Sequence, residues 1–184
     1  MARLSLCLPP FSPDYSGVSS VFFDLPAVVA IHDASGCTGN YTGYDEPRWY
    51  GAGAAIFCSA LRDIDAVMGD DEKLIGRMIA ACRALDPKLT ALVGSPVPMV
   101  VGSDMKGIAT ELEARTGLPG FGFDTTGTAY YDRGVSAALI ALLERFAEPS
   151  PSVPNTVGIV GATPLDFADG VDIRNLQDAL QERG

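Results

Sequence analysis

The chain has 184 residues, with 13 lysines and arginines against 23 aspartates and glutamates and a formal net charge of −10. This length suits one large domain, or one domain and part of another. Nucleic acids and anionic membrane surfaces would repel such a chain, so neither is expected as a partner. No apolar run approaches the ~20 residues that span a bilayer, and Pro9 and Pro10 interrupt the N-terminus too early for a secretory signal. We therefore expect a cytoplasmic protein with reduced cysteines.

Apolar runs bounded by turn residues predict buried strands, and they alternate with runs of helical periodicity. In chain order, strands are expected over residues 27–31, 54–58, 89–93, 120–124 and 156–160. Helices are expected from Asp70 to Leu85, from Asp104 to Thr116, over residues 135–146 and over residues 172–183. This alternation predicts an α/β fold, a parallel Rossmann-like sheet with helices on both faces.

Residues 148–155 are rich in proline and serine and predict a linker, because such a run continues neither a helix nor a sheet. The expected organisation is an α/β domain over residues 1–147, the linker, and a partial second α/β unit over residues 156–184. A lone strand–helix unit cannot bury both of its faces. The second unit therefore either packs on the first domain or begins a domain of a longer chain.

The loop after the first expected strand holds the only histidine, His32, and the cysteine Cys37, which follows Gly36. Open α/β sheets bind ligands at the carboxyl ends of their strands. A glycine lets the backbone approach a bulky group, and a thiolate is the ligand that iron–sulfur clusters need. His32 is a candidate catalytic group that could orient a ligand or move a proton. Taken without further information, the residues favour the alternative interpretation, a small side chain in a tight turn and a hydrogen-bonded structural histidine.

Other loops at the same edge carry further polar residues. Ser95 follows the third expected strand, and either Ser103 or Asp104 can cap the helix after it. The segment from Asp45 to Trp49 combines carboxylates, a guanidinium and an indole, which suits either a partner contact or local pairing. Cys58 and Cys82 lie in apolar runs and are expected in the core. Cys7, near the N-terminus, is assigned no role.

Three motifs, taken in order, resemble the nitrogenase component 1 family, which includes nitrogenase molybdenum–iron protein subunits and dark protochlorophyllide reductase subunits. The segment His32-Asp-Ala-Ser-Gly36-Cys37 resembles the family's His-Gly-Pro-x-Gly-Cys loop. The segment from Ser95 to Asp104 resembles a Cys-Pro-x-x-x-x-Gly-Asp-Asp motif, and residues 69–75 resemble an acidic helix start. The resemblance covers about residues 9–147, and residues from Thr156 onward resemble the start of the family's second domain.

The resemblance implies an oxidoreductase subunit that passes electrons through an iron–sulfur cluster to an unknown substrate. It also implies an ATP-dependent reductase iron protein as electron donor, and a homo- or heterodimer with a related subunit. Cys37 would be the metal ligand, beside Gly36, with Asp14 and Ser95 at positions where relatives carry further cysteines. A cluster shared across a two-fold axis would take Cys37 from each chain. The alternatives are a carrier of a metallocluster or small ligand, and a structural domain with an empty crevice.

Overall fold

In the computed structural model, the described residues are 12–42, 51–69, 71–149, 151, 153–163, 166 and 171–182. Their helices and strands are, in chain order, α1 (Asp14–Phe22), β1 (Ala27–Ile31), α2 (Gly36–Thr42), β2 (Ala55–Cys58), α3 (Asp63–Met68), α4 (Asp71–Leu85), β3 (Leu89–Val93), α5 (Pro96–Val101), α6 (Met105–Thr116), β4 (Gly120–Phe123), α7 (Tyr131–Phe146) and α8 (Val171–Gln181). None of the helices in these ranges is long and apolar enough to cross a membrane.

The strands form one parallel sheet in the order β2-β1-β3-β4, which confirms the expected fold class. β1 and β3 occupy the centre, and all five residues of each strand are buried. β2 is an edge strand and is only half-buried. Because the strands are parallel, all four carboxyl ends meet at one edge of the sheet. This edge collects the loops that the sequence singles out.

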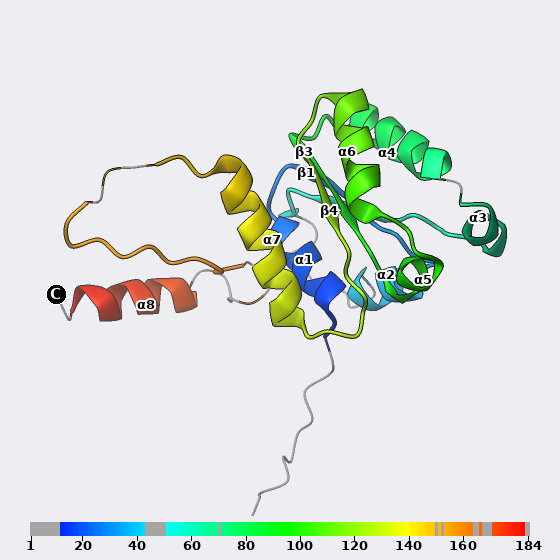
Figure 1. The fold of residues 1–184 in the computed structure, drawn as a ribbon. Helices are drawn as coiled ribbons and strands as arrows, with labels where there is room; N and C mark the ends of the chain where they lie inside the picture. Colours follow the sequence, from blue (N-terminus) through cyan, green and yellow to red (C-terminus); the bar gives the residue numbers. More distant parts are fainter. Residues whose placement is uncertain are drawn as a thin grey trace, which may run out of the picture.

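Helices cover both faces of the sheet, as expected (Figure 1). On one face, Val29 and Ile31 of β1 pack into a core with α1 and α7. On the other face, the alternate residues Val28 and Ala30 pack into a core with α4 and α6. A strand whose successive side chains are all buried needs a helix layer on each side. The continuous apolar run in the sequence is the consequence of that arrangement.

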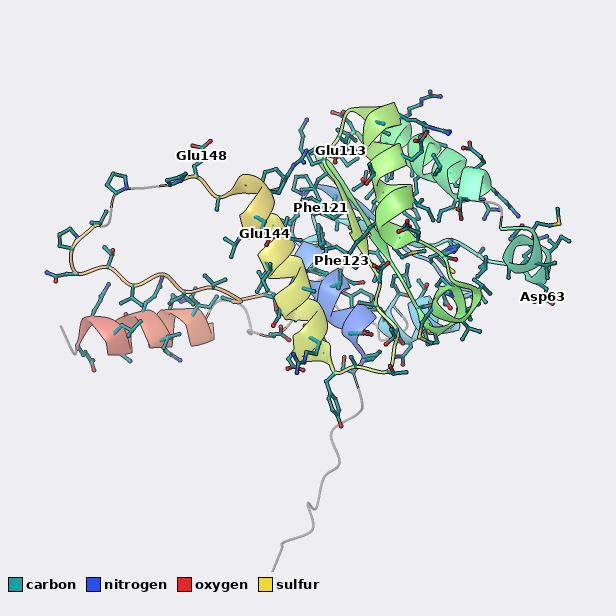
Figure 2. The ribbon with its side chains drawn as sticks, viewed as in Figure 1. Asp63, Glu113, Phe121, Phe123, Glu144 and Glu148 are labelled. Carbon is teal, nitrogen blue, oxygen red and sulfur yellow. The ribbon has the colours of Figure 1, made fainter. Side chains whose placement is uncertain are left out.

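Aromatic contacts join β4 to α1. Phe121 and Phe123 lie on β4, near α1 and α7 in Figure 2. Their rings lie 5.7 and 5.8 Å from the ring of Phe22, in tilted and edge-on arrangements that aromatic pairs favour. The contact fixes α1 against the sheet and so positions the residues at the start of that helix.

The strand expected over residues 156–160 does not form. These residues are exposed, and no strand in the described part of the chain pairs with them. A strand needs a hydrogen-bonded neighbour, so an apolar run alone does not make one. The final expected helix is present as α8. The hydroxyl of Tyr131, at the start of α7, donates a hydrogen bond of 2.9 Å to Asp166, which lies in the segment that precedes α8. The division into two units stays a prediction.

Candidate functional site

The candidate site lies at the carboxyl edge of the sheet. His32 follows β1 directly, Ser59 follows β2, and Ser95 lies two residues after β3. β1 pairs with β2 on one side and with β3 on the other, so the strand order reverses between β1 and β3. The Cys37 loop and the Ser95 loop lie on either side of this point, where open α/β sheets bind ligands.

The carboxylate of Asp33 holds the Cys37 loop. Its Oδ2 atom accepts the backbone N–H groups of Ser35, Cys37 and Thr38 at 2.9, 2.8 and 3.2 Å. The Ser95 hydroxyl donates to the His32 carbonyl at 2.8 Å and lies 3.4 Å from Asp33 Oδ1. A carboxylate that accepts the first N–H groups of a helix fixes where the helix begins. Asp33 therefore sets the start of α2 and the place of Cys37.

Cys37 is partly buried and packs against the core that contains Tyr15, and its thiol interacts electrostatically with Tyr15, Asp33 and Ser95. Burial raises the pKa of the Cys37 thiol, and the hydrogen bond from Tyr15 opposes that rise. Burial and the contact with Cys37 also raise the pKa of Tyr15 to about 12. Both groups are therefore protonated at neutral pH. The structure brings Cys37 and Ser95 together, as the resemblance implies, and adds Tyr15 from α1.

The raised pKa of Cys37 predicts slow alkylation. The thiolate is the nucleophile, so a raised pKa lowers its fraction at pH 8. We expect Cys37 in the folded protein to react with iodoacetamide at least severalfold more slowly than in the urea-unfolded chain, with a rate that still increases above pH 9. Tyr15→Phe removes a hydrogen bond that lowers the pKa of the thiol and should slow the reaction at pH 8 further. Peptide-resolved mass spectrometry measures both rates, and equal rates in the folded and unfolded chain would contradict the expectation.

His32 is buried, and burial lowers the pKa of its imidazole despite the nearby carboxylates of Asp71, Asp33 and Asp65. Its Nδ1 atom lies 2.9 Å from the Ser59 hydroxyl. That hydroxyl also accepts the backbone N–H of Asp33 at 3.0 Å. The neutral ring therefore joins the end of β2 to the loop after β1.

Asp14, the expected oxygen ligand, is buried at the start of α1, and hydrogen bonds engage both carboxylate oxygens. Oδ1 accepts the N–H groups of Tyr15 and Gly127 at 2.9 and 2.8 Å, and Oδ2 accepts that of Thr126 at 3.0 Å. Asp14 thus anchors the loop after β4. Ligation of a metal by Asp14 would require these bonds to break.

Thiols are sparse at this edge. Within the described ranges, no group of three or more His, Cys, Asp or Glu side chains is placed to hold a metal ion. Cys82 is buried in the core, as expected. Cys58 is not: it is half-buried at the end of the edge strand β2, where its sulfur lies 3.4 Å from the Asp33 carbonyl oxygen. Cys7 and the segment from Asp45 to Trp49 lie outside the described residues.

One buried group of the loop has no partner. The Thr38 hydroxyl, next to Cys37, forms no hydrogen bond with any described residue. In contrast, the open space beside Gly36 would accept a Cβ atom without meeting any atom within 4 Å. Contacts with the described residues therefore do not require the glycine.

The family of nitrogenase component 1 type oxidoreductases matches residues 14–184. The chain belongs to this family. Two solved structures share its fold, nitrogenase Cp1 at pH 5 and nitrogenase Cp1 at pH 6.5, each with a TM-score of 0.58 and 16% sequence identity. The similarity covers 78% of this chain but only 31% and 30% of those chains, so the sequence spans about a third of their length. No curated protein matches the chain.

Sequence reasoning did not identify the partners that fix Cys37. Tyr15 lies on α1, a helix that the sequence did not predict, and Ser59, which contacts His32 and Asp33, lies beyond the second strand. Asp33 carried a detectable signal, because an aspartate a few residues before a helix commonly caps it. The signal can be used only if a helix is expected to begin at Gly36, and the sequence did not predict α2.

Proposed function

We propose that this component 1-type chain is an oxidoreductase subunit in which Cys37 is one ligand of an iron–sulfur cluster shared with a second subunit. The observation that carries the proposal is the position of Cys37 at the reversal of strand order, where the Asp33 carboxylate contacts both the Cys37 backbone N–H and the Ser95 hydroxyl. In the proposal, electrons arrive from an ATP-dependent reductase iron protein.

The described residues of one chain do not fit a complete cluster. A four-iron cluster takes about four thiolate ligands, and this edge offers the two thiols Cys37 and Cys58 with hydroxyl and carboxylate oxygens that are already hydrogen-bonded. The proposal therefore requires a homo- or heterodimer in which the second subunit supplies the remaining ligands.

In this proposal the other expected site residues do not bind the cluster; they keep the strand ends and loops around Cys37 in place or leave space beside it. His32, with its neutral imidazole on Ser59, holds the strand end from which the Cys37 loop leaves. Ser95 fixes the same strand end through the His32 carbonyl. Asp14 keeps the loop after β4 in place. Gly36 leaves the surface beside Cys37 open to the second subunit.

The test is iron and acid-labile sulfide content after purification without oxygen. We expect both in the wild-type protein and a loss of at least tenfold in Cys37→Ala. Cys82→Ala is the matched control, because Cys82 is buried in the core on α4 and should leave the iron content unchanged. Iron at background in the wild type, or iron retained in Cys37→Ala, would contradict the proposal.

A second candidate is a carrier that binds a metallocluster or small ligand without catalysis. The raised pKa of Cys37 favours it, since a thiol that stays protonated holds iron weakly. A carrier should transfer its iron to an acceptor apoprotein with the sulfide intact. A redox subunit should instead keep its iron through cycles of dithionite reduction and reoxidation, followed by visible absorption.

A further inference from the structure

A hollow of about 400 Å³ lies beside the edge strand β2, outside the Cys37 loop. β1, β2 and α4 form its walls. Phe57 on β2 is in register with Ala30 on β1. α4 packs against β1, and 42% of the Phe57 side chain stays exposed. The face of the edge strand is therefore incompletely covered.

The walls are apolar and closely packed. Leu74 and Met78 on α4 are 5% and 3% exposed and belong to the core beneath the hollow. Ala30 and Ala81 have small side chains, which leave the space open between the strand and the helix. A volume of this size lies at the lower end of ligand pockets, roughly 300–1,000 Å³. It suits a single aromatic ring or a short alkyl chain.

A cation lies at the margin of this apolar space. Arg77 lines the hollow, and its guanidinium Nη1 atom donates to the carbonyl of Ser59, another lining residue, at 2.6 Å. A guanidinium has five N–H donors, and among the described residues Arg77 forms no ion pair. The neighbouring charges, Lys73 and Asp65, pair with each other at 2.6 Å. Asp65 also interacts electrostatically with Arg77, but its two oxygens accept hydrogen bonds from Lys73 and Arg62, so among the described residues Arg77 keeps N–H donors for a further anion.

We propose that this hollow binds a small amphiphilic carboxylate, with its apolar part between Phe57, Leu74 and Met78 and its carboxylate on Arg77. Guanidinium–carboxylate hydrogen bonds are charge-assisted and often bidentate, and the Ser59 carbonyl already restricts the orientation of the Arg77 side chain. The hollow lies outside the Cys37 loop, although Cys58 and Ser59 at the end of β2 line it, and ligand binding there does not depend on a cluster. Its success or failure is therefore independent of the proposed redox function.

The test is an NMR titration of the ¹⁵N-labelled protein with octanoate, and with 1-octanol as the neutral probe of the same chain length. We expect saturable shifts of the Ala60, Arg77 and Ala81 amides, and octanoate affinity about tenfold above that of 1-octanol. Arg77→Gln should remove this tenfold preference and leave 1-octanol binding unchanged. Arg83→Gln makes the same charge change on α4 outside the hollow and should keep the preference.

Ala81→Leu fills the hollow and should abolish the binding of both probes. An unchanged urea midpoint shows that each variant is folded. The proposal fails if octanoate binds no more tightly than 1-octanol, or if Ala81→Leu leaves octanoate binding unchanged. It also fails if octanoate does not bind and the protein forms a dimer that Ala81→Leu dissociates, because a second copy then occupies the hollow.

Discussion

Gly134→Ala is expected to lower the free energy of unfolding by about 3 kcal/mol, the upper part of the range for overpacked sites. A Cβ atom at Gly134 of α7 would lie 1.8 Å from the carbonyl oxygen of Asp14 and 2.9 Å from the backbone nitrogen of Val18. The facing glycine on α1 is equally tight, since a Cβ at Gly17 would lie 2.1 Å from the Tyr131 carbonyl oxygen. These neighbours are backbone atoms, so the two helices would have to separate.

The matched control is Gly76→Ala. Gly76 lies in α4, and a Cβ there would meet no atom within 4 Å. Alanine is the better helix former, so this change should raise the free energy of unfolding by about 0.5–1 kcal/mol. Urea denaturation followed by circular dichroism measures both variants. If Gly134→Ala has the same effect as Gly76→Ala, the two helices do not approach as closely as the structure shows.

The close approach of α1 and α7 also matters for the site. α1 carries Asp14, which holds the loop after β4, and Tyr15, which contacts Cys37. Separation of the helices should displace both residues. Gly134→Ala is therefore also expected to increase the rate of Cys37 alkylation, although Gly134 itself does not contact the thiol.

The sheet could be predicted from the sequence because its central strands are buried on both faces. β1 appears as an unbroken apolar run over residues 27–31, and β3 as a run over residues 89–93 whose one polar residue is Thr90; the structure places both strands at these bounds. α1 could not be predicted in this way. Its sequence is rich in serine and contains Gly17, and these residues are weak helix formers. Packing against Gly134, more than 110 positions later in the chain, stabilises that helix.

The segment over residues 156–160 is the opposite case, because the sequence predicts a strand there and the structure has none. Its valine and isoleucine predict a strand, but strand formation also needs a partner, and none is present in the described part of the chain. At the site, parallel strands imply that His32 and Ser95 share one edge. The contact between Cys37 and Tyr15 depends on α1, and for that reason the sequence alone did not reveal it.

Asp33→Ala is expected to lower the free energy of unfolding by about 2–3 kcal/mol and to increase the rate of Cys37 alkylation at pH 8 at least tenfold. The buried carboxylate accepts three backbone N–H groups, and helix-capping hydrogen bonds of this kind contribute up to about 2 kcal/mol, with more for charged acceptors. The negative charge of Asp33 and its hydrogen bond both raise the pKa of the Cys37 thiol. Their loss should lower that pKa while the loop becomes more accessible.

Two variants separate these effects. Asp33→Asn removes the charge and keeps one oxygen acceptor, so it should lower the pKa of the thiol with a smaller loss of stability. Asp124→Ala removes an exposed carboxylate at the same edge of the sheet, which lies 3.6 Å from Lys106. Exposed ion pairs contribute little, so this control should change the free energy of unfolding by less than about 1 kcal/mol and leave Cys37 unaffected. If Asp33→Ala alters neither stability nor the alkylation rate, then Asp33 does not hold the loop, and the position of Cys37 must depend on α2 alone.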